Sequence, residues 1–102
     1  MKETKYAVRL LRAAEDDLND LVSYIAVENR TTAEMVATKI ERNLARLSFY
    51  PRLGKIPKDE ELNCLGYRFL VVENYLIFYT IEERTILIHR IVHGARDYLS
   101  LL

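Results

Sequence analysis

The sequence predicts a two-layer α+β domain in which an N-terminal strand and a helical hairpin pack on a mainly antiparallel sheet. Three observations predict this fold. Residues 66–98 are too continuously apolar for a surface helix and are rich in Val, Ile, Phe and Tyr, as strands are. Two earlier segments repeat apolar residues at spacings of three and four, as amphipathic helices do. A chain of 102 residues that is 50% hydrophobic suffices for one domain, over 1–102, with its own core.

Polar breaks divide the apolar segment into three strands. The breaks fall at 73–74 and 82–84, so we expect antiparallel strands at 67–72, 75–81 and 85–93. Alternation in the third strand directs Ile86, Ile88, Arg90 and Val92 to one face and Leu87, His89, Ile91 and His93 to the other. Both faces carry apolar residues. We therefore expect one face to be the core and the other a half-covered surface on which a partner docks.

The first half of the chain supplies the second layer. Residues 6–11 alternate as a short strand that lies against the sheet. One helix is expected at 13–27, and a second begins at Thr31, which with Glu34 has the spacing of a capping box, and ends before Pro51. The short link makes the helices an antiparallel hairpin that covers one sheet face and leaves the other exposed. Residues 51–63, with both prolines and six charges, are expected to form a loop.

Composition restricts the classes of function. Fifteen basic and fifteen acidic residues cancel, so nucleic-acid binding would need a local basic patch. No stretch approaches the roughly 18 apolar residues of a membrane span, and no signal-peptide pattern is visible. The single cysteine, Cys64, cannot form an internal disulfide and indicates a reducing cytoplasm. No metal-ligand spacing or phosphate-binding glycine loop is present, so we expect no cofactor and no metal.

Taken together, these segments resemble the RelE/ParE superfamily of bacterial type II toxin-antitoxin toxins. The resemblance lies in the order and spacing of DLNDLVSYIAVEN, TTAEMVATKIERNLARL, FYPRLGK, GYRFLVVENYLIFYTIEE and HGARD, and it covers nearly the whole chain. It implies a RelE/ParE-like fold and a small cytoplasmic toxin held inactive by a cognate antitoxin. RelE-like members are ribosome-dependent mRNA endonucleases, whereas ParE-like members inhibit DNA gyrase.

An endonuclease of the RelE type needs a group that activates the ribose 2′-OH and cations that stabilise the phosphorane. The resemblance places Arg68 and Arg96 at two of its four cation positions and the apolar Leu70 and Leu76 at the other two. Losing one charge-assisted phosphate contact typically costs about a hundredfold in rate, so two losses would cripple an enzyme of this design.

A nuclease that uses a different set of groups stays open as the alternative. Its candidate catalytic residues are Arg68, Arg96, His93 and Tyr98. His89 is a further possible acid or base, although histidines in phase with apolar strand residues are more often structural.

The ParE-like interpretation fits the sequence better, because the DLxDLxxYI helix, the PRLGK turn and the HGARD close are more similar to ParE relatives. The function is then binding, without an acid or base. The candidate target-binding residues are Arg68, Arg90, Arg96 and Tyr98. The candidate antitoxin-binding residues are Leu99, Leu101 and Leu102, in a terminal helix or tail. An inactive relative that only binds antitoxin is the third alternative.

Overall fold

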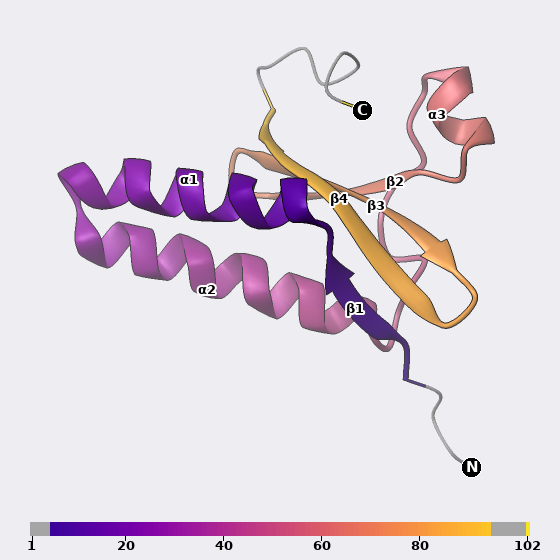
Figure 1. Cartoon of the computed structure of the whole chain (residues 1–102), viewed down its shortest axis with the longest axis horizontal. Helices are drawn as coiled ribbons and strands as arrows, with labels where there is room; N and C mark the ends of the chain where they lie inside the picture. Colours follow the sequence, from indigo (N-terminus) through magenta and orange to yellow (C-terminus); the bar gives the residue numbers. More distant parts are fainter. Residues whose placement is uncertain (1–4, 95–101) are drawn as a thin grey trace.

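The computed structural model describes residues 5–94 and 102. Figure 1 shows the element order: β1 (Ala7–Leu10), α1 (Arg12–Glu28), α2 (Arg30–Leu47), α3 (Glu60–Cys64), β2 (Arg68–Val72), β3 (Tyr75–Glu82) and β4 (Thr85–His93). The strands form one sheet in the order β1-β4-β3-β2. β1 runs parallel to β4, and the other two pairs are antiparallel. The predicted α+β fold, with its helical hairpin and mainly antiparallel sheet, is confirmed.

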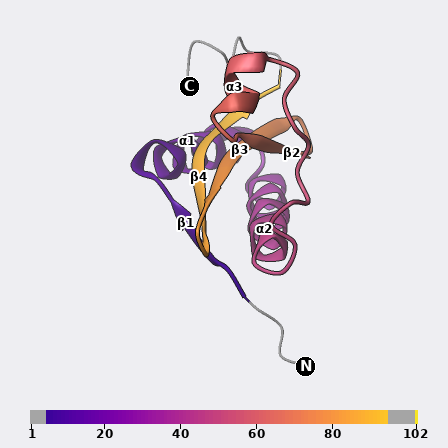
Figure 2. The same ribbon diagram turned by 90° about the vertical axis from the view of Figure 1, so that its right-hand side faces the viewer.

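Helices α1 and α2 form the second layer. They lie antiparallel beside each other and extend past the sheet (Figure 1), and Figure 2 views the pair nearly along the helix axes. Their apolar stripes meet one face of the sheet, because burial removes those side chains from water. The buried core contains Ala14, Leu21, Val36, Ile40, Leu44 and Leu47 from the helices and Leu70, Val72, Ile77, Tyr79, Ile86, Ile88 and Ile91 from the strands.

A β-bulge in β4 changes which face its last residues occupy. The pairing register shifts at Phe78, so that two residues of β4, His89 and Arg90, oppose one residue of β3. Ile88 and Ile91 therefore both belong to the helix-facing core. The simple alternation predicted from the sequence is wrong beyond Ile88, because the extra residue inverts the phase of the strand.

The second face of the sheet is only partly open. Phe78 and Val92 in its centre are 1% and 3% exposed, and Thr80 is buried as well. The Phe78 ring also contacts the ring of Phe69, with the centroids 5.8 Å apart. The expectation that the hairpin leaves this face exposed is therefore wrong for its central rows.

Two helix starts differ from the prediction. The side chain of Asn29 accepts a hydrogen bond from the backbone N–H of Thr32 at 3.0 Å, so Asn29, not Thr31, caps α2. The expected loop over 51–63 contains α3, whose cap is Asp59, because its carboxylate accepts from the N–H of Leu62. In Figures 1 and 2, α3 lies apart from α1 and α2. None of the described helices combines the length and apolar composition that crossing a membrane requires.

Candidate functional site

Half of the residues that the sequence nominates for function can be placed. Arg96, Tyr98, Leu99 and Leu101 lie outside the described residues, and their roles stay predictions. Leu102 is half-buried. The remaining three, Arg68, Arg90 and His93, lie on β2 and β4.

Arg68 supports a turn. It pairs with Tyr79 in the register of β2 and β3 and shares the phase of the core residues Leu70 and Val72. Its Nη1 donates to the carbonyl oxygen of Gly54 at 3.0 Å. Its alternating position puts Arg68 on the face of β2 that carries Leu70 and Val72, which packs on the helices.

Arg90 forms an ion pair with α1. Its Nε donates to Oδ2 of Asp17 at 2.7 Å and its Nη2 to Oδ1 at 2.9 Å. The same Oδ2 accepts from the backbone N–H of Ile91 at 2.9 Å, on the stretch of β4 beyond its pairing with β1. This hydrogen bonding from Asp17 raises the pKa of Arg90. Asp17 therefore faces β4 rather than solvent, and a target that binds the Arg90 guanidinium has to compete with this pair.

The histidines do not assemble a site with Arg68. His93 pairs with Tyr75 at one end of β3, while Arg68 pairs with Tyr79 four residues further along. Strand geometry separates these rows by about 13 Å. His93 also makes an edge-on ring contact with Tyr75, at 5.6 Å between centroids.

His89 lies on the second sheet face in a small polar network. Its Nε2 is 2.9 Å from Thr80 Oγ1, and its Nδ1 is 3.3 Å from Tyr67 Oη. Burial lowers the pKa of His89, against an opposing influence of Glu82, and burial raises the pKa of Tyr67. The neutral ring, with one donor and one acceptor nitrogen, matches two hydroxyl partners. The structural interpretation of His89 therefore accounts for these contacts.

The hydroxyl of Tyr79 anchors the turn at 51–54. The Tyr79 hydroxyl donates to the carbonyl oxygen of Pro51 and accepts from the N–H of Gly54, both at 2.8 Å. A Cβ on Gly54 would lie 2.6 Å from that hydroxyl oxygen, so only glycine fits without a shift. Lys55 continues the turn into a two-bond antiparallel bridge with Phe69 at the outer edge of β2.

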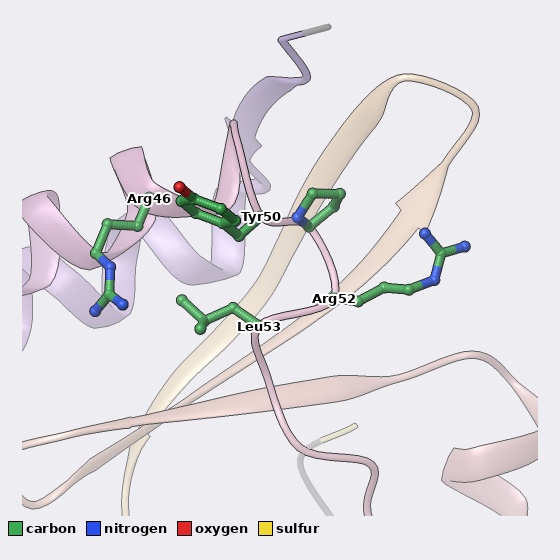
Figure 3. A pocket seen from close by; sticks show the side chains of 5 residues that line it. Arg46, Tyr50, Arg52 and Leu53 are labelled. Carbon is green, nitrogen blue, oxygen red and sulfur yellow. The ribbon is translucent and has the colours of Figure 1, made fainter. Parts of the chain in front are cut away.

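This turn forms one wall of an open hollow of about 630 Å³ lined by Arg46, Tyr50, Pro51, Arg52 and Leu53. In Figure 3, Arg46 and Arg52 extend in opposite directions, and the ring of Tyr50 and the side chain of Leu53 lie between them. Tyr50 is 64% exposed. A second hollow of about 320 Å³ shares Arg46 and Leu53 and is also lined by Asn43, Gly54, Lys55, Phe69, Leu70 and Val71. We call the two together the edge groove, because they share Arg46 and Leu53 and the second lies at the outer edge of β2.

The edge groove is basic in a chain of zero net charge. Between residues 39 and 58 the sequence has six basic residues and one acidic residue. Lys39 in this segment pairs with Glu73, whereas the exposed Arg46 and Lys55 line the groove. The lining contains no carboxylate and no imidazole. It is suited to binding an anionic, partly apolar partner. Sequence reasoning missed this site, although the signal was Arg46, Tyr50 and PRLGK within ten positions.

Comparison with known proteins identifies the family. A family model described as the ParE toxin of the type II toxin-antitoxin system parDE matches residues 8–98. A chain of the chromosomal ParDE system from P. aeruginosa has the same fold, with a TM-score of 0.71 at 18% identity over 88% of this chain and 97% of its own. A chain of the toxin-antitoxin complex RelBE2 from Mycobacterium tuberculosis has a TM-score of 0.63 at 26% identity over 93% and 98%. No curated protein sequence matches. The match over most of its length shows that this chain belongs to the family of ParE toxins of type II toxin-antitoxin systems.

Proposed function

We propose that this chain is a cytoplasmic toxin that binds DNA gyrase and stops DNA synthesis, and that a cognate antitoxin holds it inactive in a complex. The family model supports the toxin role. The antitoxin is supported by the two similar structures, because one belongs to a ParDE system and the other is a toxin-antitoxin complex.

The observation that carries the choice of gyrase is the state of the described catalytic candidates. Arg68 is bonded to the turn at Gly54, and His93 lies at the other end of the strand register. Phosphate cleavage needs its acid, base and cations within hydrogen-bond reach of one phosphate. Separated groups that are already engaged support a binding function over an endonuclease.

The positions at which the nuclease pattern has cations support the same choice. Leu70 belongs to the buried core beneath α1 and α2, and Leu76 is half-buried. A charged side chain at Leu70 would lose its hydration there, at a cost of several kcal/mol by the usual burial penalty. The core packing of this chain is therefore built around an apolar residue where a nuclease of that design has a cation.

Pulse labelling of DNA and protein synthesis after induction of the chain tests the proposal. Arg96→Ala is induced in parallel, with Arg30→Ala, an exposed arginine at the start of α2, as the matched control. We expect DNA synthesis to fall first, with filamentous cells, Arg96→Ala to weaken the effect, and Arg30→Ala to preserve it.

Two outcomes contradict this proposal. If protein synthesis falls first, with mRNA cut at translated codons, the chain is a ribosome-dependent endonuclease. If neither synthesis falls, the chain is an inactive relative that binds antitoxin.

A further inference from the structure

Two exposed arginines flank an exposed aromatic ring in the first hollow of the edge groove. Figure 3 shows Arg46, in the last turn of α2, and Arg52, in the turn that follows, extending in opposite directions with the ring of Tyr50 between them. Within residues 5–94, neither guanidinium pairs with a carboxylate. The Tyr50 side chain belongs to a residue that is 64% exposed. Both charges and the ring are therefore accessible to a ligand.

The turn that carries Tyr50 and Arg52 is anchored to the core. The Tyr79 hydroxyl bonds two backbone groups of this turn, and the Arg68 guanidinium bonds a third. The backbone N–H of Tyr50 also donates to the carbonyl oxygen of Arg46 at 2.9 Å, which ties the turn to α2. Groups that are positioned before a ligand arrives lose less conformational entropy when it binds. The two arginines and the ring therefore form one preorganised surface.

Cations on both sides of an aromatic ring match the repeat of a single-stranded nucleic acid. Such a strand has a phosphate on each side of every base, and its unpaired bases stack on aromatic side chains. A duplex keeps its bases stacked inside the helix, so it would use the arginines but not the Tyr50 ring. An acidic peptide likewise supplies charges without planar bases. The hollow of about 630 Å³ has the size of sites that hold small organic ligands, which is enough for a base with its sugar.

The second hollow extends this basic surface beside β2. The exposed Lys55 lines it together with Arg46, so a strand that leaves the Tyr50 ring on this side meets a further cation. Within the described part of the chain, Lys55 has no carboxylate partner either. A chain of zero net charge binds nucleic acid only through a local excess of basic residues. The edge groove supplies that local excess.

We propose that the edge groove binds single-stranded DNA, with one base stacked on Tyr50 and the flanking phosphates on Arg46 and Arg52. The choice of DNA over RNA rests on the proposed function, because the proposed target works on DNA. The chemistry of the ligand, an unpaired strand bound through its phosphates and one base face, rests on the groove alone. The toxin then contacts the DNA at its target as well as the target itself.

The test measures the fluorescence anisotropy of a labelled ten-nucleotide oligothymidylate, titrated with the full chain at several salt concentrations. We expect Arg46→Ala/Arg52→Ala to weaken binding at least about tenfold. Each phosphate contact with a single strand contributes about 0.7 to the slope of log affinity against log salt concentration, so this variant should lower the magnitude of the slope by about 1.4.

The matched control is Arg9→Ala/Arg30→Ala, which removes the same charge from two exposed arginines outside the groove. Arg9 lies on β1, at the opposite edge of the sheet from β2, and Arg30 lies at the opposite end of α2 from Arg46. This control should keep the wild-type slope and change the affinity less than about threefold.

Tyr50 variants separate stacking from charge. Tyr50→Ala should weaken binding at least about fivefold, because it removes the stacking surface, and should leave the salt slope unchanged, because the ring carries no charge. Tyr50→Phe keeps the ring and should bind within about twofold of wild type. Tyr24→Ala, which removes an exposed ring from α1, is the control and should bind as wild type does.

Five results overturn the inference: no binding of the oligothymidylate, wild-type affinity of Tyr50→Ala, tighter binding of a ten-base-pair duplex, tighter binding of a ten-nucleotide oligouridylate, or equal binding of decaglutamate. Arrest of DNA synthesis is measured on the same proteins. If the oligothymidylate does not bind while the wild-type chain still arrests DNA synthesis, this inference alone is wrong. If the wild-type chain causes no arrest, the proposed function is wrong, whatever the oligonucleotide does.

Discussion

Removing one oxygen atom from Tyr79 should loosen the turn that walls the edge groove. The hydroxyl of this buried tyrosine bonds two backbone groups of the turn, the carbonyl of Pro51 and the N–H of Gly54. Tyr79→Phe keeps the ring in the core and deletes only these two bonds. Arg68 still holds the Gly54 carbonyl oxygen, so the turn keeps one anchor.

The expected loss of stability follows from the two backbone groups that lose their hydrogen-bond partner. Each buried backbone group that loses its partner costs about 1–3 kcal/mol. Pro51 is half-buried, which puts its carbonyl towards the low end, and Gly54 is buried. We therefore expect Tyr79→Phe to lower the free energy of unfolding by about 2–4 kcal/mol, out of a typical total of about 5–15 kcal/mol.

Urea unfolding of both proteins, with hydrogen exchange at the Gly54 amide, measures this prediction. Tyr24→Phe is the matched control, because Tyr24 is 77% exposed and has no hydrogen bond within the described chain. The free energy of unfolding of Tyr24→Phe should stay within about 0.5 kcal/mol of the wild-type value. This prediction is refuted if Tyr79→Phe also leaves the free energy of unfolding unchanged and its Gly54 amide exchanges at the wild-type rate.

Three further perturbations test the packing around the site. Asp17→Ala leaves Arg90 and a β4 amide without their shared acceptor and should cost about 3 kcal/mol in a thermal or urea melt, whereas an equal stability would show that the pair is dispensable. Gly54→Ala forces a Cβ to within 2.6 Å of the Tyr79 hydroxyl oxygen, 2.7 Å of a Tyr79 ring carbon and 2.9 Å of the Phe69 carbonyl oxygen, so it should destabilise the chain even when combined with Tyr79→Phe, which removes only the first contact. The lowered pKa of His89 means that the unfolded chain binds its proton more readily, so stability should fall as the pH drops below 6.5. His89→Gln should weaken this dependence of stability on pH. An unchanged pH dependence would show that other groups cause it.

The two layers and the three later strands could be predicted from the sequence, because the spacing of apolar residues and the polar breaks between segments are local signals. The spacing of apolar residues from Ala14 to Leu47 sets both helices, and the polar break after Val72 sets a hairpin turn, where Glu73 takes a positive φ of 54°. Asp59 before two glutamates also has the pattern of a helix start, but the prolines at 51 and 57 favoured a loop.

The phase of β4 was beyond the sequence because both of its faces are apolar. With or without the bulge at His89 and Arg90, apolar residues lie on both sides of the sheet. The sequence pattern is therefore compatible with a regular strand and with a bulged one. The ion pair of Asp17 with Arg90 could not be predicted either, because the two residues are 73 positions apart and meet only in the folded chain. The edge groove likewise joins α2, a turn and β2, and no local pattern reports that juxtaposition.

The proposed function requires this chain to inhibit DNA gyrase by binding it. The most direct measurement is the supercoiling of relaxed plasmid by purified gyrase in the presence of the purified chain, with its antitoxin complex as the control. We predict that the free chain inhibits supercoiling at stoichiometric concentrations and that the complex does not. Full supercoiling activity in the presence of excess free chain would contradict the account.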